Sequence, residues 1–229
     1  MTQALRAVLF DVFGTLLDVH SVAQSAERVF PGAGMHLSLL WRDKQIEYSR
    51  VRALSQRYVL FSELTRDALR YAADVLALPL NDAICDALMN EYSHLSPFAD
   101  ARPALMRWQQ QGAALGVLSN GDREMLVRAL RGAAIDEFFP HVLSADAAET
   151  FKTAAAVYQL GPDRLRLPAA QILFVSSNGW DAAGAKWFGY RSFWVNRNAA
   201  PRERLGPAYD GSGRDLGAAA DYFFAHSKE

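Results

Sequence analysis

The sequence predicts an α/β protein: a Rossmann-like core with a parallel sheet, and an all-helical cap domain inserted after the first strand. Three observations predict this fold. A short apolar run at Val8–Phe10 is typical of a buried strand in such a core. Roughly eighty residues of helical periodicity follow, with no convincing strand. From Asp100 onward, strands separated by single helices indicate right-handed crossovers and hence a parallel sheet.

The composition suits one large domain, or a core with a smaller inserted domain. Of the 229 residues, 51% are hydrophobic, and 24 Lys and Arg nearly balance 25 Asp and Glu. This balance excludes a disordered chain and offers no basic footprint for nucleic acid. The only cysteine, Cys85, excludes a disulfide within the chain and favours a reducing compartment. Because the N-terminus lacks an export signal and no apolar run approaches bilayer length, we expect a cytoplasmic protein with no membrane partner.

The cap is predicted to span residues 17–97, with residues 1–16 and 98–229 forming the core domain. Thr65 is expected to cap a helix that ends before Pro79, and Asn81 or Asp82 to open the next one. An earlier helix is predicted from one apolar stripe, which consists of Leu37, Leu40, Trp41, Tyr48 and Val51.

Helices and strands alternate in the predicted core. Residues 196–220 carry little signal, and the aromatic run at 221–225 is expected to form one last short strand. Between Asp100 and residue 195, the expected order is a helix to Gly112, a strand at 113–118, a helix at 122–131, a strand at 141–144, a helix after Lys152 through Leu160, a strand at 172–175, a helix to Phe188 and a strand at 192–195.

Polar residues follow three of these strands at the point where each ends. In open α/β sheets, ligands bind just beyond the carboxyl ends of the strands. Taken singly, each group is an ordinary turn or a solvated side chain, but their joint placement at one edge indicates a site. The groups are Asp11 with Thr15, Ser119 with Asn120, Ser176 through Asp181, and Lys152 between the last two.

Five short motifs make this arrangement more specific. They are Phe10–Leu16, Asp18–Ser21, Trp41–Tyr48, Leu118–Gly121 and Phe174–Gly179. With them the chain resembles the haloacid dehalogenase superfamily, and specifically its (S)-2-haloacid dehalogenases, from Val8 to about Val195. In the order that the superfamily uses, Asp11 matches its nucleophile, Ser119 its Ser or Thr, Lys152 its Lys, and Asp181 its acidic cluster.

Phe13 separates this resemblance from the phosphatases of the same superfamily. Phosphatases carry a second Asp two residues after the nucleophile, which protonates the leaving oxygen, and they gather further carboxylates around Mg²⁺. Here the second position is Phe13, and Asp181 is the only acid in the last loop. A halide needs no proton to leave, and an apolar ring helps a small substrate displace water. We therefore expect no metal and no cofactor.

The resemblance implies hydrolytic dehalogenation in two displacements. Asp11 attacks C2 of an (S)-2-haloacid to give an ester and free halide, and water then releases an (R)-2-hydroxy acid. Lys152 favours ionised Asp11 and, with Ser119 and the backbone amides of Val12 and Phe13, holds the substrate carboxylate.

The resemblance also assigns the remaining site residues. Arg42 and Asn120 meet the departing halide, because a weakly hydrated guanidinium suits a soft anion. Asp181 is the candidate to position or deprotonate the hydrolytic water, with Lys152 or through Ser176 and Asn178, so the choice of a single base stays open. The supporting polar positions are Thr15, Tyr158, Ser176, Ser177 and Asn178, and the apolar wall is Ile46, Phe61 and Trp180.

Two other functions compete with this one. The first is a small-molecule phosphatase of the same fold, and the second is a non-catalytic binding protein that retains the fold. The expected partners are the 2-haloacid substrate and halide product, with no nucleic acid, and the resemblance implies a homodimer.

Overall fold

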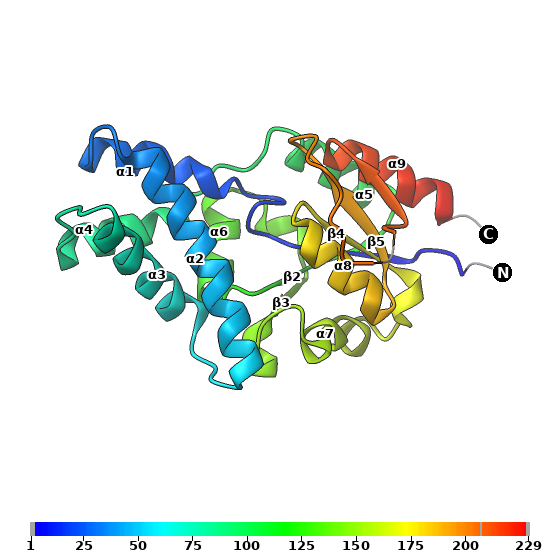
Figure 1. Ribbon diagram of the computed structural model, residues 1–229. Helices are drawn as coiled ribbons and strands as arrows, with labels where there is room; N and C mark the ends of the chain where they lie inside the picture. The colour runs from blue at the N-terminus through cyan, green and yellow to red at the C-terminus, as the bar shows by residue number, and fades with distance from the viewer. Residues whose placement is uncertain (1–2, 207, 228–229) are drawn as a thin grey trace.

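The computed structural model describes residues 3–206 and 208–227, and it shows a sheet beside a lobe of helices (Figure 1). All neighbouring strands are parallel, in the order β3-β2-β1-β4-β5-β6. The predicted fold class is confirmed, although residues 1, 2, 207, 228 and 229 of the predicted core lie outside the described residues. The strands are β1 (Ala7–Phe10), β2 (Ala114–Ser119), β3 (His141–Ser144), β4 (Ile172–Ser176), β5 (Arg191–Val195) and β6 (Gly211–Gly213).

Helices cover both faces of the sheet. Because successive strand residues point to opposite faces, Val8 and Phe10 of β1 pack on one side while Ala7 and Leu9 pack on the other. On the first side lie α5 (Ala101–Gln110), α6 (Arg123–Gly132) and α9 (Leu216–His226), and on the second α7 (Ala155–Leu165) and α8 (Gly179–Phe188).

The inserted lobe is helical, as expected. It contains α1 (Val22–Val29), α2 (Gly34–Ser55), α3 (Phe61–Val75) and α4 (Asp82–Asn90), which run from blue to teal in Figure 1. Its buried side chains join those of the first face of the sheet in one continuous core. The predicted stripe on α2 is only partly buried: Leu37 and Trp41 are inside, whereas Val51 is 55% exposed.

Two chain segments connect the lobe to the sheet and pair with each other. The Asp18 amide donates to the Ser96 carbonyl at 2.8 Å, and the Phe98 amide donates to the Leu16 carbonyl at 3.0 Å. The segment that follows β1 and carries Asp11 is therefore also one of the two connections to the helical lobe.

The prediction that Thr65 caps a helix was wrong. Helix α3 begins one turn earlier at Phe61, and Thr65 is fully buried inside it. Its hydroxyl donates to the Phe61 carbonyl at 2.6 Å, the internal bond that a mid-helix Thr can make. The prediction at Asn81 is confirmed, because its side chain accepts a hydrogen bond from the Ile84 amide at 2.9 Å.

The prediction of a last strand at 221–225 was also wrong. These residues belong to α9, which Asp215 caps by accepting a hydrogen bond from the Ala218 amide. The buried residues of α9 are Leu216, Ala219, Ala220 and Phe223, a helical spacing that the aromatic run concealed. The sixth strand is instead Gly211–Gly213, at the edge of the sheet.

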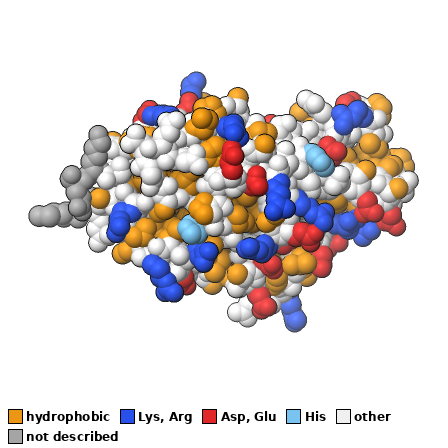
Figure 2. Space-filling view, turned by 180° about the vertical axis from the view of Figure 1, so that it is seen from behind, with side chains coloured by type: hydrophobic (Ala, Val, Ile, Leu, Met, Phe, Trp, Pro, Cys, Tyr) orange, Lys and Arg blue, Asp and Glu red, His pale blue; other side chains and the backbone are white. Residues whose placement is uncertain are grey.

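Acidic and basic side chains are interspersed on the face seen from behind in Figure 2. Within residues 3–206 and 208–227, no helix is long and apolar enough to cross a membrane.

Candidate active site

The carboxyl edge of the three central strands places the candidate residues together. Phe10 of β1 lies level with Val117 of β2 and with Val175 of β4. Asp11 follows β1 directly, so it lies between the ends of β2 and β4, where Ser119 and Ser176 lie. Strand register alone therefore explains why residues 165 positions apart in the chain form one site.

The Asp11 carboxylate accepts three hydrogen bonds. Lys152 Nζ donates to Oδ1 at 3.0 Å, while Thr15 Oγ1 and Asn178 Nδ2 each donate to Oδ2 at 2.9 Å. Asp11 is 6% exposed, so little water competes with these donors. One cation and two neutral donors thus hold both carboxylate oxygens in place, and a carboxylate is the nucleophilic form of this side chain.

Lys152 lies between two carboxylates. Its Nζ also donates to Asp181 Oδ2 at 2.8 Å, and both Lys152 and Asp181 are almost fully buried. Burial by itself would lower the pKa of Lys152, but the charges of Asp11 and Asp181 outweigh burial and raise that pKa. Burial and the charge of Asp11 raise the pKa of Asp181, even though Lys152 and Tyr158 act to lower it. Because the pKa of Lys152 lies above the ordinary lysine value of 10.5, Lys152 keeps its positive charge at neutral and moderately alkaline pH.

Three further polar side chains hold the residues around Asp11 and Lys152 in place, those of Tyr158, Thr15 and Ser176. Tyr158 Oη donates to Asp181 Oδ1 at 2.7 Å, and burial raises its pKa so that it keeps its proton. Thr15 Oγ1 accepts from the Ser177 amide at 2.8 Å, and Ser176 Oγ accepts from the Asn178 amide at 3.1 Å. These bonds fix the loops that carry Asp11 and Asn178.

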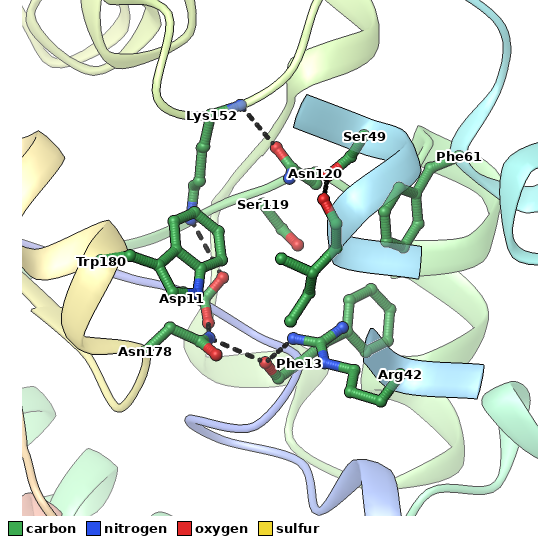
Figure 3. A pocket seen from close by; sticks show the side chains of 11 residues that line it. Asp11, Phe13, Arg42, Ser49, Phe61, Ser119, Asn120, Lys152, Asn178 and Trp180 are labelled. Carbon is green, nitrogen blue, oxygen red and sulfur yellow. Dashed lines mark hydrogen bonds and ion pairs between the residues drawn. The ribbon is translucent and has the colours of Figure 1, made fainter. Parts of the chain in front are cut away.

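A cavity of about 20 Å³ lies in front of Asp11, between the sheet edge and helix α2 (Figure 3). Asn120 Oδ1 accepts from the Lys152 amide at 2.8 Å, which leaves the Asn120 NH₂ group as a donor for a ligand. Apolar atoms of Phe13, Ile46, Phe61 and Trp180 wall the cavity. Its lining is completed by Asp11, Arg42, Ser49, Ser119, Asn120, Lys152 and Asn178.

Arg42 reaches this cavity from the helical lobe. Its Nη2 donates to the Phe13 carbonyl at 3.2 Å, the same oxygen that Asn178 Nδ2 contacts at 3.2 Å. Figure 3 shows Arg42 and Asn178 approaching this carbonyl from opposite sides. A residue far from the sheet in sequence thus contributes a permanent positive charge opposite the Asp11 carboxylate.

Ser177 is not part of this cavity. It lines a neighbouring cavity of about 400 Å³, and its buried Oγ has no hydrogen-bond partner in the described part of the chain. Arg42, Ile46 and Asn178 line both cavities, so they form the partition between them. Thr15, Tyr158, Ser176 and Asp181 do not face the first cavity, but they hold residues that do. Among the described residues, no protein acceptor binds the amides of Val12 and Phe13.

Three residues that the sequence reasoning did not single out contact this arrangement. Ser49 lines the cavity one turn beyond Ile46, where the helical spacing could have indicated it. Gln45 accepts a hydrogen bond from Arg42 and donates one to the buried Thr65, and it lies in the Trp41–Tyr48 motif. Arg197 donates to the Thr15 carbonyl at 2.9 Å and lies over the Phe98 ring, but its segment gave no sequence signal.

This geometry suits nucleophilic attack by a carboxylate on a small anionic substrate. Three donors hold the Asp11 carboxylate, and Lys152, Asn120 and Arg42 supply donors and positive charge around the cavity. Phe13 provides an apolar wall where a general acid would otherwise stand. Across the described residues, no three His, Cys, Asp or Glu side chains are grouped so that they could hold a metal ion.

Comparison with known proteins gives consistent relatives. The family model of haloacid dehalogenase-like hydrolases matches residues 5–189. An (S)-2-haloacid dehalogenase from Pseudomonas sp. (strain CBS-3) is 42% identical over 208 residues, which is 91% of this chain and 91% of the relative.

Solved structures of similar proteins superpose closely. The crystal structure of an L-2-haloacid dehalogenase is 47% identical, with a TM-score of 0.94 over 97% of this chain and 100% of that one. The L-2-haloacid dehalogenase from Xanthobacter autotrophicus, with chloropropionic acid covalently bound, is 34% identical, with a TM-score of 0.89 over 95% and 97% of the two chains.

Proposed function

The chain belongs to the haloacid dehalogenase-like hydrolases, and from this membership and its site we infer that it hydrolyses small (S)-2-haloacids to (R)-2-hydroxy acids and halide. One observation carries the assignment within the family. The buried Asp11 carboxylate faces a small cavity together with Phe13, and no second acid stands at that position to protonate a leaving oxygen. The site therefore favours a leaving group that departs as an anion.

In the first displacement, an oxygen of Asp11 attacks C2 from the side opposite the carbon–halogen bond. The new C–O bond forms as the halogen leaves with the bonding electron pair, so the configuration at C2 inverts. Lys152, Ser119 and the amides of Val12 and Phe13 bind the substrate carboxylate in this proposal, and Arg42 and Asn120 receive the halide. The covalent adduct in the Xanthobacter autotrophicus relative supports an ester intermediate.

In the second displacement, water adds to the carbonyl carbon of the Asp11 ester. The bond between that carbon and the ester oxygen then breaks, which frees the hydroxy acid and restores the carboxylate. Both Asp181 oxygens are already engaged, one by Lys152 and one by Tyr158, and Asp181 does not line the cavity. This supports a role for Asp181 exerted through Lys152 rather than by direct contact with water.

The helical lobe has a defined part in this proposal. Residues 17–97 form a cap that carries Arg42 and closes over a core made of residues 1–16 and 98–229. Contacts across the boundary support this division, because the Ser62 amide donates to Asp122 at 3.0 Å and Tyr58 Oη donates to Asp146 at 2.9 Å. We place the enzyme in the cytoplasm, where its single cysteine stays reduced.

The function is tested by halide release from the two enantiomers of 2-chloropropionate. The (S) enantiomer is expected to yield chloride and (R)-lactate, with turnover unaffected by EDTA, and the (R) enantiomer to yield none. Phosphate release from phosphate esters that depends on Mg²⁺ would instead favour the phosphatase function. Binding of the haloacid with no turnover would favour a binding protein.

We propose that the enzyme is a homodimer. Several large apolar side chains are exposed on the cap helices, among them Leu54 at 87%, Val51 at 55% and Val75 at 55%. Where exposed apolar side chains form a contiguous patch, they mark an interface between proteins. Light scattering after size exclusion is expected to give the mass of two chains at micromolar concentration, and the mass of one chain would contradict this proposal.

A further inference from the structure

Gln45 is a polar side chain that the proposed reaction does not use, yet it is completely buried in the cap. It lies on α2, three residues after Arg42, so both side chains project from one face of the helix. Burying an amide costs free energy unless each of its donors and acceptors finds a partner. The partners of Gln45 therefore indicate what the residue is for.

Its hydrogen bonds fix which way the amide points. Thr65 Oγ1 uses its single proton on the Phe61 carbonyl at 2.6 Å, so toward Gln45 it can only accept. Gln45 Nε2 therefore donates to Thr65 Oγ1, at 2.7 Å, and reaches Tyr92 Oη at 3.3 Å. The Gln45 Oε1 atom is left facing Arg42, whose Nη1 donates to it at 2.5 Å.

Arg42 is thus held at two points, both by neutral acceptors. Nη1 is bound to Gln45 and Nη2 to the Phe13 carbonyl at 3.2 Å. A guanidinium has five N–H donors, so donors remain for a bound anion. Because neither acceptor carries a charge, the full positive charge of Arg42 stays available to the cavity.

We propose that Gln45 is a positioning residue for halide departure, which orients Arg42 without neutralising it. This rests on the proposed function, in which Arg42 meets the leaving halide. A Glu at this position would have the same shape and would bind Arg42 more strongly. However, its negative charge would compensate the guanidinium and weaken the stabilisation of the departing anion.

The test compares Gln45→Glu with the parent enzyme on (S)-2-chloropropionate and (S)-2-bromopropionate. Chloride is the poorer leaving group, so it depends more on Arg42. We expect kcat for the chloro substrate to fall by about tenfold or more, and the bromo substrate to lose clearly less. Gln24→Glu makes the same change on the exposed surface of α1 and is expected to leave both rates unchanged.

The same substitution in an Arg42→Ala enzyme separates a positioning role of Gln45 from general damage to the structure. In an Arg42→Ala enzyme the residue that Gln45 acts on is gone, so adding Gln45→Glu should lower the remaining rate little further. If Gln45→Glu does not fold, Gln45→Met provides the same comparison by removing the acceptor at similar volume. Its chloro rate should also fall more than its bromo rate.

The outcomes distinguish this inference from the proposed function. Absence of halide release by the parent enzyme would overturn both. Normal release by the parent, with equal losses on both substrates in Gln45→Glu and Gln45→Met, would overturn only the role of Gln45. A fall in kcat of the same size when Gln45→Glu is added to the parent and to the Arg42→Ala enzyme would also overturn that role.

Discussion

Asp11→Asn is expected to lower kcat for halide release by at least about a thousandfold, because an amide is a far weaker nucleophile than a carboxylate. The substitution keeps the shape of the side chain but removes the charge that attacks C2. Lys152 then faces one carboxylate instead of two, so the local electrostatics change as well. Initial rates of chloride release from (S)-2-chloropropionate measure the effect.

Asp43→Asn is the matched control, since Asp43 is exposed on α2. It makes the same chemical change away from the cavity, so we expect parental kcat and KM. Retention of more than about a tenth of the parental kcat by freshly prepared Asp11→Asn enzyme would contradict the role of Asp11 as nucleophile.

Lys152→Met has the second-largest expected effect, and it should change both turnover and stability. The substitution leaves the Asp11 and Asp181 carboxylates buried without the cation between them. Breaking a buried ion pair costs about 3–5 kcal/mol of unfolding free energy. We also expect kcat to fall by about a hundredfold or more, because the nucleophile and the substrate carboxylate both lose the cation that binds them.

The pH dependence of Lys152→Met follows from the directions of the pKa shifts. In the parent, the pKa of Lys152 is higher in the folded protein than its ordinary value of 10.5. The contribution of Lys152 to the unfolding free energy is therefore fully present below pH 10.5, and it is lost only as the pH rises through the pKa of the folded protein. In the variant, the pKa of Asp181 loses the cation that lowers it, so proton uptake stabilises the variant as pH falls. The difference in unfolding free energy should therefore be larger at pH 9 than at pH 5.

Urea unfolding at both pH values, together with the pH profile of kcat, measures this second prediction. The acid limb of the activity profile is expected to move to higher pH in Lys152→Met. Lys186→Met removes a partly exposed lysine paired with Asp210, and it should leave the activity profile unchanged. An unshifted acid limb in Lys152→Met would contradict the electrostatic role of Lys152.

Much of the fold could be predicted because its signals are local. The buried strands β1, β2 and β4 are continuous apolar runs, and each ends in the polar residues that build the site. Thr65 and the last helix were mispredicted for a shared reason. For Thr65 the local signal was a hydroxyl near an expected helix start, and for the last helix it was an aromatic run. In both cases contacts with distant residues decide the structure instead.

Some residues of the site could likewise be predicted from the sequence, and others could not. Asp11, Lys152 and Asn178 could be predicted because sheet topology and the family resemblance place them at one edge. The contacts of Arg197 could not, because the donor lies in a segment of weak signal and its acceptors, Thr15 and Asp100, are about 180 and 100 positions away along the chain. The sequence also does not show that Ser177 faces a second cavity, because backbone direction decides between neighbouring residues of a loop.

The most direct test of the Asp11 ester is a single turnover in H₂¹⁸O with enzyme in excess over (S)-2-chloropropionate. If water attacks the Asp11 ester, the first lactate formed carries unlabelled oxygen from Asp11. Mass spectrometry of the peptide that contains Asp11 should then show one ¹⁸O atom in that residue. Labelled lactate from the first turnover, with no label in the Asp11 peptide, would mean that water attacks C2 directly and would contradict the mechanism.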